Sequence, residues 1–202
     1  DFDPFADDAM EALESLSQAE GGQVREFLDP AKVTEVTVRV KPALVTVRQI
    51  GRDGGPRGTG SGFVVSKEGL VVTNLHVVGE GQPVEVEFSD GSKRRVVEVR
   101  ASDRHYDLVV LKLEPGEELS ALALGDSDGI AQGDLVLGFG APQGLGFSVV
   151  PGAISAIRKL DPGFAGEGET PEFPMLQLAM TIEQGNSGGP VVNLKGEVLG
   201  VV

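Results

Sequence analysis

The sequence predicts an all-β protein built from two antiparallel barrels, with a short helical segment at the N-terminus. Short runs rich in β-branched residues follow one another from about residue 43, and glycine-containing turns separate them. No helical stretch separates successive strands, which disfavours parallel βαβ units. Glycine accounts for 29 of the 202 residues. That fraction is about twice the usual ~7% and is typical of a chain with many tight turns.

Residues 1–31 are predicted to form an acidic helical arm. Its first 30 residues hold nine carboxylates against one arginine, and so carry −8 of the net charge of −14. Gly21-Gly22 ends the helical pattern. We expect either a solvated helix or an arm whose Phe2 and Phe5 pack on another subunit. Four apolar residues recur at roughly helical spacing: Phe5, Met10, Leu13 and Leu16.

A second, short helix is predicted from Lys32 onward, where the main domain (residues 32–202) begins. Val33, Val36 and Val40 follow helical spacing. Thr34 is the candidate N-cap residue, and Pro42 is expected to end the helix.

The predicted strands fall into two groups. The first barrel, about residues 43–113, holds six runs: 43–50, 61–66, 70–74, 84–88, 94–100 and 107–113. An acidic connector follows over residues 114–133. The second barrel, about residues 134–202, holds five runs: 134–140, 147–159, 174–181, 190–194 and 197–202. Two similar six-stranded barrels are therefore expected, the second lacking its last strand at the C-terminus.

Composition excludes several functional classes. A net charge of −14 argues against nucleic-acid binding, because such proteins usually carry a basic face. The absence of cysteine excludes disulfides, thiolate metal sites and a cysteine nucleophile. With only His76 and His105, a multi-histidine metal centre is disfavoured as well. No apolar run approaches the ~18 residues of a membrane helix. We expect no metal, no cofactor and no membrane insertion.

The segment Gly185-Asn186-Ser187-Gly188-Gly189-Pro190 is the most informative for chemistry. An apolar strand is predicted on each side of it, and its glycines allow the backbone to turn its N–H groups toward one point. Such a pocket stabilises an oxyanion, which is the largest single contribution to acyl-transfer catalysis. Ser187 is therefore the candidate nucleophile, beside an oxyanion pocket formed by residues Gly185, Asn186 and Ser187.

A serine nucleophile needs a general base, and His76 at the end of an apolar run is the candidate. His105 lies in a charged turn and is the rival base. Asp107 begins the next apolar run and is the candidate carboxylate that orients the imidazole, with Asp103 as the alternative. The chain order His76, Asp107, Ser187 is the chymotrypsin order. It differs from the orders of subtilisin and of the α/β-hydrolases.

Three segments resemble the catalytic motifs of the HtrA (Deg) serine proteases, which have the chymotrypsin-type fold: Thr73-Asn74-Leu75-His76-Val77-Val78, Asp107-Leu108-Val109-Val110-Leu111-Lys112 and Gly185-Asn186-Ser187-Gly188-Gly189-Pro190. The further matches include Gly60-Ser61-Gly62-Phe63 and Leu124-Gly125-Asp126-Ser127-Asp128. The resemblance covers about residues 32–202.

The resemblance implies a serine endopeptidase that acts on unfolded or misfolded proteins in periplasmic or other extracytoplasmic quality control. His76 is then general base and later acid, Asp107 its orienting partner and Ser187 the nucleophile. The N–H groups of Gly185 and Ser187 form the oxyanion hole. The family also implies a homotrimer and a downstream PDZ domain, which this sequence does not contain.

Two departures from the family pattern concern the surroundings of the nucleophile. Leu178-Ala179-Met180 stands where the family usually has Thr-Asp-Ala, and the chain stops at Val202, before a further wall of the specificity pocket. By position, Thr181, Ile182, Val201 and Val202 are expected to contact substrate. Thr181 and Ile182 would lie at the base of the P1 pocket. Because that base holds no carboxylate, we expect cleavage after Val, Ala or Leu rather than after Arg or Lys. The alternatives are a catalytically silent binding module and a serine esterase on the same fold.

Overall fold

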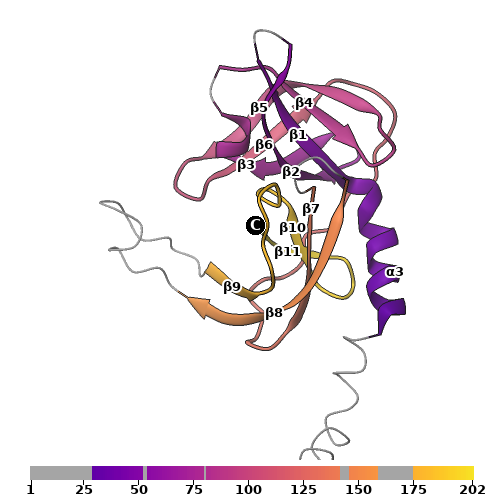
Figure 1. Ribbon diagram of the computed structural model, residues 1–202, viewed down its shortest axis with the longest axis vertical. Coiled ribbons are helices and arrows are strands. Elements are labelled where there is room, and N and C mark those ends of the chain that lie inside the picture. The colour runs from indigo at the N-terminus through magenta and orange to yellow at the C-terminus, as the bar shows by residue number, and fades with distance from the viewer. Residues whose placement is uncertain (1–28, 52–53, 80, 142–145, 159–174) are drawn as a thin grey trace, which may run out of the picture.

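A computed structural model describes residues 29–51, 54–79, 81–141, 146–158 and 175–202. The predicted arm at residues 1–31 lies almost entirely outside these ranges. The chain forms a closed barrel at one end of the molecule and an open sheet at the other, with Val202 between them (Figure 1). A helix lies beside the open sheet. Within the described ranges, no helix is long and apolar enough to cross a membrane.

The helix α3 spans Pro30–Val40 and confirms the second predicted helix, although its first turn differs from the prediction. Asp29 is the N-cap, and its carboxylate accepts a hydrogen bond from Ala31 N–H at 2.9 Å. Thr34 lies inside the helix, so the prediction that Thr34 is the cap is wrong. Asp followed by Pro is a strong start signal, because Asp accepts a free N–H and Pro has none to leave unpaired. After Val40 the chain continues in a 3₁₀ turn, η1, at Lys41–Ala43.

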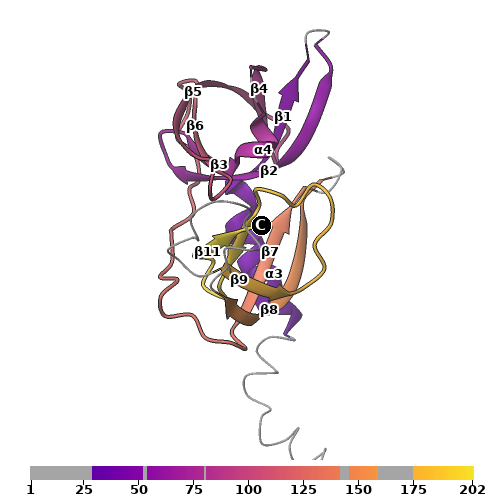
Figure 2. The same ribbon diagram turned by 90° about the vertical axis from the view of Figure 1, so that its left-hand side faces the viewer.

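The first barrel has the six antiparallel strands that the sequence predicts. They are β1 (Leu44–Ile50), β2 (Pro56–Ser66), β3 (Leu70–Asn74), β4 (Val84–Phe88), β5 (Lys93–Asp103) and β6 (Leu108–Leu113). Their order around the closed barrel is β1-β2-β3-β6-β5-β4. Figure 2 shows the barrel as a ring. In β4, Val84, Val86 and Phe88 are buried and alternate with two more exposed glutamates, which is the pattern of a strand with one face in a core.

Among the described residues, the second sheet has five antiparallel strands and is open. They are β7 (Leu135–Gly140), β8 (Ser148–Arg158), β9 (Met175–Ala179), β10 (Pro190–Val192) and β11 (Val198–Val201). The order is β11-β10-β7-β8-β9, so β9 and β11 are its edges. This arrangement confirms the expected half-barrel with one strand fewer than the first barrel.

One hydrophobic core joins the two halves. It contains Phe63 and Leu111 of the first barrel, Val36 of α3, and Phe139 and Val192 of the second sheet. All five side chains are at most 2% exposed. The two halves are therefore packed on each other, and segments that lie where they meet have fixed positions relative to both.

Candidate active site

His76 and Asp107 lie next to each other at one end of the first barrel. His76 belongs to α4, a four-residue helix at Leu75–Val78 that directly follows β3. Its ring Nδ1 forms a short hydrogen bond with the carboxylate Oδ2 of Asp107. The backbone N–H of His76 donates to the other carboxylate oxygen, Oδ1, at 2.9 Å. The carboxylate therefore holds both the ring and the main chain of His76.

The position of Asp107 is set by the end of β3. Asp107 lies one residue before β6 and has a φ of +54°, a conformation that Asp tolerates better than most residues. Its carbonyl accepts the Leu75 N–H at 2.9 Å and the side-chain amide of Asn74 at 3.0 Å. Asn74 pairs with Leu108 in the β3–β6 ladder. Because strand pairing places these residues side by side, the first barrel alone brings the imidazole and the carboxylate together.

Ser187 lies in the turn between β9 and β10, in which Gly185 has a φ of +104°. In the described part of the chain, the N–H groups of Gly185 and Ser187 donate no hydrogen bond. Both are thus available to an incoming acceptor. The neighbouring N–H groups are engaged: Asn186 donates to Glu183 O at 3.1 Å, Gly188 to Val202 O at 3.0 Å and Gly189 to Asn186 O at 2.8 Å.

The turn that carries Ser187 rests on the first barrel, close to the strand that leads to His76. Ser61 N–H in β2 donates to Ser187 O at 2.8 Å. A Cβ added to Gly188 would lie 2.2 Å from Ser61 O and 3.1 Å from Asn74 N, two residues before His76. The three predicted catalytic residues therefore come from two segments in direct contact. Between these described residues, no hydrogen bond joins the Ser187 hydroxyl to the His76 imidazole.

Asn186, the central residue of the predicted oxyanion segment, is buried. Its side chain packs against Gly140 at the end of β7, where an added Cβ would lie 2.3 Å from Asn186 Oδ1. Asn186 Oδ1 is buried without a hydrogen-bond partner. The side chain thus faces the second sheet, and the N–H groups on either side of this residue remain the available donors.

The predicted substrate-binding residues are placed in two different ways. Val202 is bonded to the turn that carries Ser187, since its N–H donates to Gly189 O at 3.0 Å. Val201 pairs with Pro190 and lines a mostly apolar cavity of about 530 Å³.

Thr181 and Ile182, the other predicted substrate-binding residues, follow β9 and are exposed. Across the described ranges, no hydrogen bond ties either of them to Ser187.

The rival candidates form a separate turn. The Asp103 carboxylate accepts the N–H groups of His105 at 2.8 Å and Tyr106 at 3.1 Å. The His105 ring packs edge-on against Tyr106, with 4.8 Å between ring centroids. Asp103 thus shapes the loop before Asp107, while the carboxylate that meets His76 is that of Asp107.

Two residues at this site were not assigned a role from the sequence. The first is Asn74, whose side-chain amide binds Asp107 O. The second is Ser61, whose hydroxyl binds Gly185 O at 2.6 Å. Both are polar and buried in strands. Since buried polar groups need partners, a polar residue directly after the apolar run of β3 was the signal for Asn74, whereas Ser61 lies in the glycine-rich residues 58–62 and gave no such signal.

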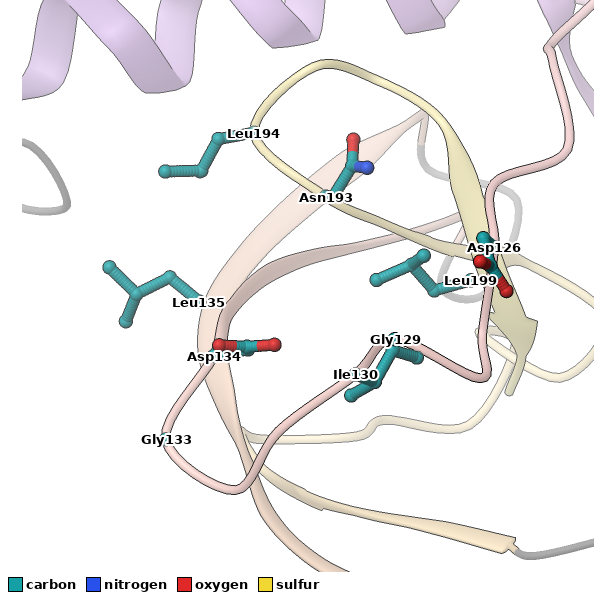
Figure 3. Close-up of a pocket in the computed structure, with 9 residues that line it drawn as sticks. All are labelled: Asp126, Gly129, Ile130, Gly133, Asp134, Leu135, Asn193, Leu194 and Leu199. Atoms are coloured by element: carbon teal, nitrogen blue, oxygen red, sulfur yellow. The ribbon is translucent and has the colours of Figure 1, made fainter.

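A second cavity, of about 360 Å³, lies away from these residues (Figure 3). Asp126 and Asp134 reach it from the connector and the start of β7, and Leu194 from the turn after β10. None of the predicted site residues lines it. It is therefore not part of the candidate site.

The resolved pKa shifts belong to groups on the outside of the first barrel. A hydrogen bond to Glu85 raises the pKa of Lys93. A hydrogen bond from the backbone of Arg95 lowers the pKa of Glu114. These groups contact neither the His76–Asp107 pair nor the Ser187 turn.

Comparisons with known proteins agree with this geometry. Residues 60–201 match the family described as trypsin-like peptidase domain. The chain is 36% identical over 174 residues to serine protease HTRA4 of Homo sapiens, covering 84% of this chain and 36% of that protein. It is 39% identical over 145 residues to a probable periplasmic serine endoprotease, DegP-like, of Halomonas elongata, covering 72% and 29%. The chain thus spans about a third of the length of the curated relatives it matches.

Proposed function

Because the chain belongs to the trypsin-like serine peptidases of the HtrA (Deg) family, we propose that it hydrolyses peptide bonds in proteins through His76, Asp107 and Ser187. The observation that carries this proposal is the carboxylate of Asp107, which binds both the ring and the backbone of His76. A purely structural Asp would need no such double contact with an exposed imidazole.

In the proposed reaction, the His76 imidazole takes the proton of the Ser187 hydroxyl as that oxygen attacks the scissile carbonyl carbon. The proton then passes from the imidazole to the leaving amine, and the acyl-enzyme is hydrolysed by water with His76 again as base. Asp107 keeps the Nδ1–H of the ring in place and stabilises the imidazolium. The ring nitrogen Nε2 is thereby left to face the nucleophile.

The proposed oxyanion hole consists of the N–H groups of Gly185 and Ser187. Both lack an acceptor among the described residues, while the intervening N–H of Asn186 is engaged with Glu183. Backbone donors that are fixed before the reaction stabilise the tetrahedral oxyanion without a reorganisation cost.

For the substrate, we propose unfolded or misfolded proteins in a periplasmic or other extracytoplasmic compartment. The relatives include a periplasmic DegP-like endoprotease and the mitochondrial protein HTRA2, so the compartment of this chain is part of the proposal. We propose that Thr181 and Ile182, which are exposed after β9, line the P1 pocket and that cleavage follows Val, Ala or Leu. Profiling with a peptide library tests this specificity, and dominant cleavage after Arg or Lys contradicts it.

We also propose that residues 1–31 form an arm that supports a homotrimer, next to a protease domain at residues 32–202. The first barrel, the connector and the second barrel then occupy about 43–113, 114–133 and 134–202. Light scattering of the chain with and without residues 1–30 tests the oligomer. An unchanged mass after removal of the arm contradicts its role in assembly.

The test of the proposed activity is digestion of casein by the purified protein, with Ser187→Ala as the matched control. We expect casein to be cleaved by the parent chain and cleavage to be lost in the variant. A chain that binds casein without cleaving it supports a silent binding module instead. Hydrolysis of simple esters without cleavage of casein supports an esterase.

A further inference from the structure

The side chain of Ser61 lies where three segments of the chain meet. It belongs to β2 and is 1% exposed. Its hydroxyl donates to Gly185 O in the nucleophile turn at 2.6 Å. The same oxygen accepts the N–H of Ala141, the residue after β7, at 2.8 Å. One hydroxyl therefore links the first barrel, the second sheet and the candidate oxyanion segment.

The main chain of Ser61 contacts the same turn. Its N–H donates to Ser187 O at 2.8 Å, and its carbonyl accepts the hydroxyl of Thr73 in β3 at 2.6 Å. Thr73 is itself fully buried. Ser61 is thus held by its neighbour in the barrel while it holds the carbonyls of Gly185 and Ser187.

Two hydrogen bonds, one of them from Ser61, restrict the peptide units on both sides of Asn186. The bond to Gly185 O orients the unit between Gly185 and Asn186, which lies between the unit that carries the Gly185 N–H and the unit that carries the Ser187 N–H. The bond between Gly189 N–H and Asn186 O orients the next unit, which carries the Ser187 N–H. An oxyanion hole needs donors that already point to one place, because each misdirected donor loses most of its effect on the transition state.

We propose that Ser61 is a positioning residue, and that its hydroxyl keeps the N–H groups of Gly185 and Ser187 directed at the oxyanion. This inference rests on the proposed function of the Ser187 turn. It goes beyond that function because Ser61 contacts neither the substrate nor the reacting atoms. The hydroxyl also connects this turn to Ala141, in addition to the packing of Asn186 against Gly140.

The test compares Ser61→Ala with Thr46→Val. Thr46 lies opposite Ser61 on β1 and is 6% exposed, so both variants remove a buried hydroxyl from neighbouring positions. We expect Ser61→Ala to lower kcat for a peptide substrate about tenfold, with KM within about twofold, because only the transition state loses stabilisation. Affinity for a peptide aldehyde, which forms a tetrahedral adduct, falls by the same factor. Thr46→Val leaves both values unchanged.

Three outcomes overturn the inference: an unchanged kcat in folded Ser61→Ala, a rise in KM alone, or an equal loss in Thr46→Val. If Ser61→Ala does not fold, Ser61→Cys takes its place. It retains a weaker donor of similar shape and is expected to lower kcat less than tenfold, while a kcat equal to that of the parent overturns the inference.

An activity-independent readout separates this inference from the proposed function. In a ¹H–¹⁵N spectrum of the full chain, Ser61→Ala is expected to shift the amide resonances of Gly185 and Ser187, and Thr46→Val is not. If the parent chain cleaves no substrate but the resonances shift, the proposed function fails and the positioning role stands. If the resonances do not move, the positioning role fails whatever the activity.

Discussion

The two halves of the candidate site are supported in different ways. The His76–Asp107 pair is held entirely within the first, closed barrel, through contacts from Asn74, Leu75 and His76 itself. The turn of Ser187 leaves an open sheet and is bonded to Ser61 of the other half. The proposed acid–base pair is therefore held within one barrel, whereas the turn of the proposed nucleophile is bonded to both halves.

The largest expected effect on activity comes from a substitution in the first barrel, which holds the His76–Asp107 pair by itself. Asp107→Asn keeps a residue type that tolerates the φ of +54°, so the backbone and the fold are expected to persist. The neutral amide no longer selects the correct imidazole tautomer, and kcat is expected to fall by about 10⁴-fold. Steady-state hydrolysis of a peptide substrate measures this effect, and circular dichroism checks the fold.

The matched control is Asp103→Asn, which alters the carboxylate that caps the preceding turn. It is expected to reduce kcat by less than about threefold, because the Asp103 carboxylate accepts the N–H groups of His105 and Tyr106, and in the described structure no hydrogen bond joins it to His76. Similar losses in both variants would contradict the assignment of Asp107 as the partner of the imidazole.

The second prediction addresses the contact between the halves. In Gly188→Ala, the new Cβ would lie 2.2 Å from Ser61 O and 2.3 Å from Thr73 Oγ1, in a residue with a φ of +84°. We expect the free energy of unfolding to fall by about 3–4 kcal/mol, because backbone strain and steric overlap add. Peptidase activity is lost as the Ser187 turn moves away from the first barrel.

Gly91→Ala separates the two contributions to that loss. Gly91 has nearly the same φ, +85°, but no atom lies within 4 Å of its added Cβ. Strain alone is expected to cost about 1 kcal/mol and to leave activity unchanged. Denaturant unfolding of both variants measures the difference. Equal costs would mean that the close approach of Gly188 to the first barrel contributes nothing.

The sequence was sufficient for the parts of this molecule that depend on local pattern. β3 and β4 begin and end at the predicted residues, since β4 alternates valine with glutamate and β3 is an apolar, β-branched run directly after Gly69, and both patterns are visible within a few residues. The N-cap was misassigned because Thr34 and Asp29 are both good caps, and only the start of the helix distinguishes them. The role of Ser61 was not predictable, because its partners Gly185 and Ala141 lie 124 and 80 residues away.

The smallest predicted effect concerns α3, which packs Val36 and Val40 into the shared core but does not reach the site. Asp29→Ala removes the N-cap acceptor of Ala31 N–H and is expected to lower the free energy of unfolding by about 1 kcal/mol. Peptidase activity should stay at the parent level. Asp29→Asn retains a capping side chain and serves as the control. A large loss of activity in Asp29→Ala would show that α3 also supports the site.

The central claim is that the imidazole of one half activates the hydroxyl of the other. Labelling with a fluorophosphonate, followed by mass spectrometry of the modified peptide, tests it most directly. The account predicts a label on Ser187 in the parent chain and labelling slowed by at least about 10³-fold in His76→Ala, because an unactivated serine hydroxyl is a weak nucleophile. A label on another residue, or equal labelling rates in the two proteins, would contradict it.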